Sequence, residues 1–277
     1  MAKGIGLIGN FKGKVGNTVG YKLTASNNGQ TQGIRVYQPI VKNPKSAGQA
    51  EQRAKLAPVN ATYRALKIVI DRGNEGLPYG NKSRLAWLKQ AFKAEHMPWI
   101  VKGGVVNRPV ACQLTKGSLA GLSIEAGEDV MKIFCNGVTS ETGVATIGAI
   151  STALLAGYPT LKAGDQITLV AVNAAGNELS SSVFSFVIDT KSAEAVSVFT
   201  AGDNYIEYSV EGIVGAYAAI VSREGANGEH LRSTSFLKVY AEALNVAPYD
   251  ATSKAAAIAS YRASAASNSD WAEESIK

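Results

Sequence analysis

The sequence predicts an α+β protein that is mainly β: a basic N-terminal hairpin and helix pair, then one or two β-sandwich (Ig-like) modules and a C-terminal helix. Three patterns support this. Apolar residues recur at helical spacing between residues 43 and 109, alternate at period two from residue 110, and give way to an alanine-rich stretch after residue 250. We expect four parts: a basic Gly-rich arm with a hairpin (1–42), a basic helical pair (43–109), a β-sandwich module (110–190) and a second β module with the C-terminal helix (191–277).

Composition and length indicate a folded protein. Of 277 residues, 46% are hydrophobic and only 18% are charged, which is not the composition of a disordered chain. The sequence has no apolar run of about 18 residues, and its first residues lack the apolar core of a signal peptide. We therefore expect no membrane partner and no classical export, and we predict a cytoplasmic or virion-associated protein.

Charge is distributed unevenly along the chain. Residues 1–116 contain 19 Lys and Arg against 4 Asp and Glu, a net charge of +15, whereas residues 117–277 contain 9 against 18, a net charge of −9. Opposite charges in the two halves favour either a basic nucleic-acid-binding face or subunits that meet basic end to acidic end. A solvated surface without a partner is the third interpretation.

The N-terminal arm combines glycines with lysines and apolar residues. Asn28-Gly29 lies between two runs of β-branched and aromatic residues, 15–24 and 33–41, and such a dipeptide favours a hairpin turn. We therefore predict a basic β-hairpin here.

A helix is predicted to begin near Ala47. Ser46 and Gln49 have the spacing of a capping box, in which each side chain bonds the other residue's backbone N–H. Pro58 predicts a kink, or two helices that meet there. The expected buried stripe consists of Leu56, Val59, Tyr63, Leu66 and Ile70.

A Gly- and Pro-rich loop over residues 73–80 precedes a second predicted helix, which ends near Pro98. Its apolar side is expected to hold Leu85, Leu88 and Phe92. We expect the two helices to pack as an antiparallel pair. Basic residues that border the two apolar stripes would then face one polyanion: Arg53, Arg64, Lys67, Lys82, Lys89 and Lys93.

From residue 110 onward, nine short runs are typical of strands in a sandwich or barrel. They cover residues 110–119, 128–136, 143–155, 165–174, 182–189, 195–201, 204–210, 216–224 and 233–240. The alanine-rich tail is predicted to be a helix capped by Asp250. Because this helix has few large apolar residues, we expect it to need a docking partner.

Motifs that would carry chemistry are weak. Residues 4–9 match G-x-G-x-x-G but follow no strand, and Gly13-Lys14 lacks the other residues of a phosphate-binding P-loop. His96 and His230 are far apart in sequence, with no cluster of metal ligands beside them. We therefore predict no enzymatic activity, no metal site and no cofactor.

The two cysteines, Cys112 and Cys135, each lie among apolar residues. This setting favours small buried thiols over a disulfide or a redox pair.

Three motifs carry a resemblance. They are G-x-x-G-x-F-x-G-x-V-G-x-x-V-G at residues 6–20, N-P-K-S-x-x-Q-x-x-Q-R at residues 43–53 and T-K-G-S-L at residues 115–119. Over roughly residues 4–190 the chain resembles a family of small uncharacterised proteins from Bacteroidota and their phages. The resemblance implies a bacterial or phage setting and a non-enzymatic role, and it assigns no catalytic residue.

We predict a non-enzymatic structural protein, a phage virion or bacterial assembly component that forms a homo-oligomer or joins other structural proteins. The residues predicted to assemble it are Phe11, Val15, Val19 and Trp271. The alternative is a sequence-independent nucleic-acid-binding protein. Its candidate phosphate contacts are Lys12, Lys14, Lys22, Arg53, Arg64, Lys67, Lys82, Lys89 and Lys93. A ligand-binding β module is a third interpretation.

Overall fold

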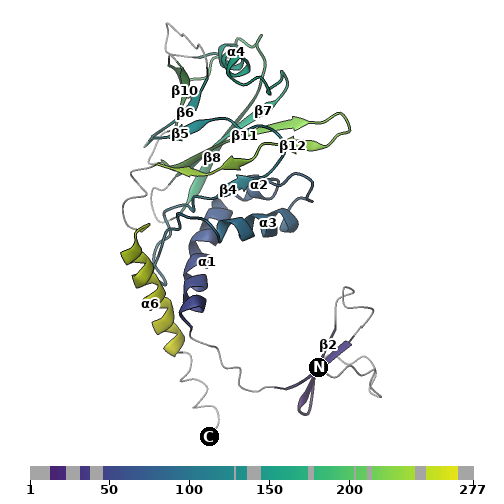
Figure 1. The fold of residues 1–277 in the computed structure, drawn as a ribbon, viewed down its shortest axis with the longest axis vertical. Coiled ribbons are helices and arrows are strands. Elements are labelled where there is room, and N and C mark those ends of the chain that lie inside the picture. The colour runs from purple at the N-terminus through teal and green to yellow at the C-terminus, as the bar shows by residue number, and fades with distance from the viewer. Residues whose placement is uncertain are drawn as a thin grey trace. The chain divides into compact units, whose positions relative to one another are not determined.

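A computed structural model describes residues 13–22, 32–37, 46–127, 129–135, 145–173, 178–202, 204–210, 214–240 and 248–267. The predicted class, α+β and mainly β, is confirmed (Figure 1). The chain divides into two compact units, one of residues 46–266 and one of residues 1–45 with 267–277. The boundaries predicted at 109/110 and 190/191 both fall inside the larger unit.

The smaller unit contains a three-stranded antiparallel sheet in the order β1 (Gly13–Val15), β2 (Thr18–Lys22), β3 (Gln32–Val36). The pairing of β2 with β3 agrees with the predicted hairpin, although Asn28-Gly29 lies outside the described residues. A second hairpin, which we did not predict, joins β1 to β2 through Gly16-Asn17. Gly16 has φ 56°, the left-handed conformation that glycine adopts without strain.

Helix α1 (Ala47–Ala65) begins as predicted, because the Ser46 hydroxyl accepts the Gln49 N–H at 3.3 Å. The reciprocal bond is not formed: Gln49 Oε1 is buried without a hydrogen-bond partner among the described residues. The helix is continuous through Pro58, and the junction with α2 (Lys67–Ile70) falls at Leu66, so two helices do not meet at Pro58.

Four of the five predicted core residues of this helical segment are buried or half-buried, but Leu56 is exposed. The small side chains of Ala50 and Ala54 occupy the buried face one turn earlier. Because Leu56 lies about 160° around the helix from Ala54, burial of the alanine face turns it outward.

Helix α3 (Asn81–Ala91) follows the predicted loop and ends well before Pro98. Its buried face holds Ser83, Trp87 and Ala91, whereas Leu85, predicted to be buried, is 57% exposed. The larger Trp87 fills the core, and Leu85 lies about 160° away from it around the helix. The predicted antiparallel pair is also wrong, since α3 crosses the C-terminal end of α1 (Figure 1).

The centre of the larger unit is an antiparallel sheet in the order β12-β11-β7-β8. Its strands are β7 (Gln166–Asn173), β8 (Ser180–Val187), β11 (Val214–Glu224) and β12 (His230–Arg232), and β14 (Lys238–Val239) also pairs with β11. A second sheet has the order β5-β6-β10-β9. It contains β5 (Ile124–Ala126), β6 (Val130–Phe134), β9 (Phe199–Ala201) and β10 (Tyr205–Ser209). A short pair joins β4 (Gln113–Thr115) to β13 (Ser235–Phe236).

Both faces of the central sheet are buried. Ile167 and Leu169 on β7 belong to a core shared with the second sheet, whereas Val170 and Val172 belong to a core shared with Trp87 of α3. Successive side chains of a strand point to opposite faces, so the unbroken apolar run of β7 fits a strand covered on both sides.

One predicted strand, residues 143–155, is instead helix α4 (Ile147–Gly157). The Thr146 hydroxyl caps it by accepting the Ala149 N–H at 3.2 Å. Ile147, Ile150 and Leu154 are buried at spacings of three and four, the period of a helix face.

The tail helix α6 (Ala251–Ser267) begins at the predicted cap, where Asp250 Oδ1 accepts the Ser253 N–H at 2.6 Å. It docks on its own chain. Ala257 is fully buried, the Ser260 hydroxyl accepts the Lys102 N–H at 3.0 Å, and Lys254 pairs with Glu51 of α1 at 3.3 Å. In the part of the chain that the structure describes, no helix has the length and apolar character needed to cross a bilayer.

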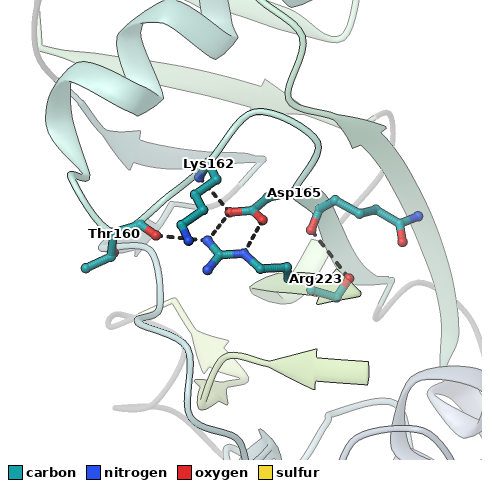
Figure 2. A network of polar contacts seen from close by, with 6 residues as sticks. Thr160, Lys162, Asp165 and Arg223 are labelled. Atoms are coloured by element: carbon teal, nitrogen blue, oxygen red, sulfur yellow. Dashed lines mark hydrogen bonds and ion pairs between the residues drawn. The ribbon is translucent and has the colours of Figure 1, made fainter. Parts of the chain in front are cut away.

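A buried ion pair ties β11 to the loop before β7 (Figure 2). The Arg223 guanidinium donates to both carboxylate oxygens of Asp165, at 2.6 and 2.7 Å, and also to the Thr160 carbonyl. The Asp165 side chain is only 1% exposed and also accepts the Lys162 N–H at 2.8 Å. The hydrogen bond to Asp165 raises the pKa of Arg223, which favours the charged guanidinium.

Removing the Arg223 side of this pair should destabilise the protein. We expect Arg223→Met to lower the free energy of unfolding by about 3 kcal/mol, because it leaves the Asp165 carboxylate buried without its cation. Urea denaturation measures the loss. The control is Lys132→Met, which breaks a half-exposed pair with Glu207 and should cost less than about 1 kcal/mol. Equal losses in the two variants would contradict the assigned role.

Candidate functional site

Strand β8 forms an open edge of the central sheet. It pairs with β7 in unbroken register from Ser180 to Val187, and no other strand in the described ranges pairs with it. The Ile188 N–H bonds the Asp165 carbonyl at 2.8 Å, which extends this ladder by one residue. In an antiparallel pair, residues whose backbone groups bond the neighbouring strand alternate with residues whose backbone groups point away from it. The backbone groups of four residues therefore point away from β7: Ser181, Val183, Ser185 and Val187.

The β8 edge lacks the usual protection against strand addition. Its sequence, SSSVFSFV, contains no charge and no proline, and Val183 and Val187 are 47% and 51% exposed. Natural edge strands are commonly short, charged, bulged or covered, since free backbone groups pair with other chains. β8 is therefore a template for an added strand. Exposed acidic residues, Glu178 and Asp189, flank it in sequence.

The N-terminal residues carry a charge opposite to that of the acidic residues that flank β8. Residues 1–45 contain seven Lys and Arg and no Asp or Glu. Among the described residues the outer strand β3 pairs only with β2, and Val36 at its end is 78% exposed.

The predicted assembly residues fall in different settings. Val15 lies in the outer strand β1, but Val19 lies in the middle strand β2, whose backbone already pairs on both sides and cannot join a neighbour's sheet. Phe11 and Trp271 lie outside the described residues.

The predicted phosphate-binding residues are also distributed over both units. Lys12 is outside the described residues, Lys14 lies 3.6 Å above the Tyr37 ring centre, and Lys22 ends β2. In the larger unit, Arg53 is half-buried, whereas the other five are exposed: Arg64, Lys67, Lys82, Lys89 and Lys93.

Three of these lysines share one face of α3 and its C-terminal extension. Lys82, Leu85, Lys89 and Lys93 follow one another at spacings of three and four, and all four are exposed. None of the three lysines forms an ion pair within the described residues. We call these four residues the α3 face.

Sequence analysis missed the residue that joins the loops beside α3. The Glu75 carboxylate accepts hydrogen bonds from the Ser118 N–H and hydroxyl, both at 2.9 Å, and from the Arg232 N–H at 3.1 Å. Burial raises the pKa of Glu75, but these hydrogen bonds together outweigh burial and hold it below its ordinary 4.5. Only the recurrence of T-K-G-S-L in the resemblance pointed to this region.

Residues of the T-K-G-S-L motif have structural roles here. The buried Thr115 hydroxyl donates to the Ser233 carbonyl at 2.7 Å. At Gly117 a Cβ atom would lie 2.1 Å from the Arg232 carbonyl oxygen, so no larger residue fits.

Two open hollows flank the Glu75 loop. One, of about 630 Å³, is lined by Trp87, Lys89 and Lys116 among others, and the second, of about 660 Å³, by Tyr79 and His230. The described residues hold no group of three metal-ligating side chains. Burial raises the pKa of Cys112 to about 12 and of Cys135 to about 11, so both buried thiols stay protonated at neutral pH.

No protein-family model, curated protein or solved structure matches this chain.

The Glu75 contacts generate a pH-dependent prediction. Because the folded-state pKa is lowered, the stabilisation is present above pH 4.5 and is lost as the pH falls through that lowered pKa. We expect Glu75→Gln to cost about 1–3 kcal/mol at pH 7 and to flatten the loss of stability below pH 4.5. Urea titrations across this pH range, with exposed Glu125→Gln as control, measure both effects. An unchanged acid limb in Glu75→Gln would contradict the assignment.

Proposed function

We propose that this protein is a non-enzymatic structural protein that assembles with copies of itself by adding a strand from one copy to the β8 edge of another. The observation that supports this proposal is the outer edge of β8, which is eight residues long, has no charged residue and pairs with no other strand among the described residues. Backbone hydrogen bonds supply affinity in such strand addition, and side-chain pockets supply specificity.

The competing edges of the larger unit are less suited to this role. β5, β9 and β12 are three residues long, so they offer few backbone groups. The length of β8 matches a complete added strand, because strands usually have about five or six residues.

The added strand is proposed to be β3 of a neighbouring copy. It has five residues, a free outer side and an exposed valine at its end. The acid-free residues 1–45 would approach an edge flanked by Glu178 and Asp189, so opposite charges steer the encounter. Because different surfaces of the two copies meet, the contact is head to tail and builds chains or closed rings.

The resemblance to proteins of Bacteroidota and their phages supports a virion or cellular assembly setting for this protein. An Ig-like arrangement of the two packed sheets, and a cytoplasmic or virion-associated location, are parts of the same proposal.

Blocking the edge should abolish assembly without unfolding the protein. We expect Val183→Lys to give a monomer at concentrations where the unchanged protein associates, since a charged side chain on an edge strand disfavours pairing. Sedimentation velocity measures the oligomeric state, and thermal unfolding checks the fold. The matched control is Val105→Lys, which alters an equally exposed valine in a loop. Unchanged association of Val183→Lys would refute the proposal.

A second candidate function is sequence-independent nucleic-acid binding through the N-terminal sheet. The observation that favours it is the absence of any acidic residue in 45 residues that carry seven cations. Such a segment would contact phosphates without reading bases.

Salt dependence tests this candidate. If Lys14, Lys22 and Arg35 contact phosphates, changing all three to Gln should reduce the slope of log K against log salt by about 0.9 for each contact. Fluorescence anisotropy with random duplex DNA measures the slope, and Lys191→Gln is the control. No binding at about 50 mM salt would eliminate this candidate and leave the assembly proposal untouched.

A further inference from the structure

We infer that the α3 face is a docking surface for the acidic segment 270–274 of a second copy of this chain. The inference deepens the proposed self-assembly by adding a second contact between copies. It depends on charge, length and apolar match between the two surfaces.

The α3 face presents three cations around one apolar side chain. Lys82 and Lys93 are eleven residues apart, which corresponds to about 16 Å along a helix. Leu85 is 57% exposed between Lys82 and Lys89. The two preceding carboxylates bond other partners and form no ion pair with these lysines: Asp71 accepts the Tyr63 hydroxyl at 2.9 Å, and Glu75 accepts from Ser118 and Arg232.

The segment after α6 has the complementary composition. Asp270, Glu273 and Glu274 place three carboxylates within five residues, and Trp271 lies among them. Three negative charges would meet three positive ones. Five extended residues span about 14 Å, close to the length of the α3 face. Trp271 would cover Leu85, since burial of apolar area supplies the lasting affinity that exposed ion pairs do not.

The exposed leucine favours this occupant over nucleic acid. A phosphate backbone offers no apolar group for the centre of the face, and all three cations are lysines, without the arginine fork that binds phosphate in bidentate fashion.

The path of the chain favours a second copy over the same chain. Helix α6 runs beside α1 and ends near its N-terminal end, whereas α3 crosses the C-terminal end of α1 (Figure 1). Since α1 has 19 residues and is therefore about 28 Å long, the end of α6 and the α3 face lie toward opposite ends of a long helix.

Complementary charge reversal tests the inference in the full-length protein. One variant carries Lys82→Glu, Lys89→Glu and Lys93→Glu, and the other carries Asp270→Lys, Glu273→Lys and Glu274→Lys. We expect each alone to associate about 10-fold more weakly by sedimentation velocity, because three exposed ion pairs become repulsive. Mixing the two variants should restore association. Loss in each variant without recovery in the mixture would overturn docking between copies.

A direct binding assay separates this inference from the β8 proposal. A fluorescent peptide of residues 268–277 is titrated onto full-length protein that carries Val183→Lys, so that strand addition does not contribute. We expect binding that weakens about 10-fold when the three α3 lysines become Glu, and that weakens with Leu85→Ser. The control reverses three other exposed lysines: Lys102, Lys162 and Lys191.

The outcomes are distinct. Peptide binding that the α3 variants reduce supports the inference even if the unchanged protein proves monomeric, which would defeat only the β8 proposal. Peptide binding that is equal in the α3 and control variants, or no peptide binding, overturns it. So does duplex DNA that binds the α3 lysines while the peptide does not.

Discussion

The burial of β7 and β11 on both faces is the constraint on which the rest of the fold depends. Ile167 and Leu169 need one covering layer and Val170 and Val172 need another, and no neighbouring segment alone supplies both. The helices before residue 110 cover one face, and the second sheet with α4 covers the other. The parts that appear separate in the sequence therefore form one compact unit. Covering both faces leaves only the edges of the sheet open.

Local patterns made much of this fold predictable. Caps at Ser46 and Asp250, the apolar run of β7 and the alternation in β10 depend on residues close in sequence, and the structure contains them. The strand predicted over residues 143–155 was wrong because the apolar positions of this segment fit the period of a strand as well as that of a helix face. The Thr146 cap and the burial of Ile150 and Leu154 in the core stabilise a helix in this segment. The predicted burial of Leu85 was wrong because the spacing of apolar residues in α3 does not indicate that Trp87 occupies the buried face.

The candidate sites were less predictable, because they depend on contacts between distant segments. The charge count located the basic part of the chain, and three of its lysines do share one face of α3 and its C-terminal extension. Local sequence patterns, however, do not indicate the order of strands in a sheet, so β8 could be predicted as a strand but not as an edge strand. Glu75 bonds Ser118 and Arg232, which lie 43 and 157 positions away in the sequence. The residues next to Glu75 in the sequence do not indicate either partner.

An open edge and a charged face have different consequences for assembly. Backbone pairing at an open sheet edge is indifferent to sequence, so the proposed strand addition at β8 would by itself also accept a strand from an unrelated chain. In the proposed assembly charge would supply the discrimination, because the acid-free segment and the edge flanked by Glu178 and Asp189 have opposite charges, whereas two copies of β8 do not. A contact between unlike surfaces either closes reciprocally, in a pair or a larger ring, or continues into an open chain. The proposed pairing of β3 with β8 therefore sets which surfaces meet, and the path of the chain between them decides whether the contacts close or continue.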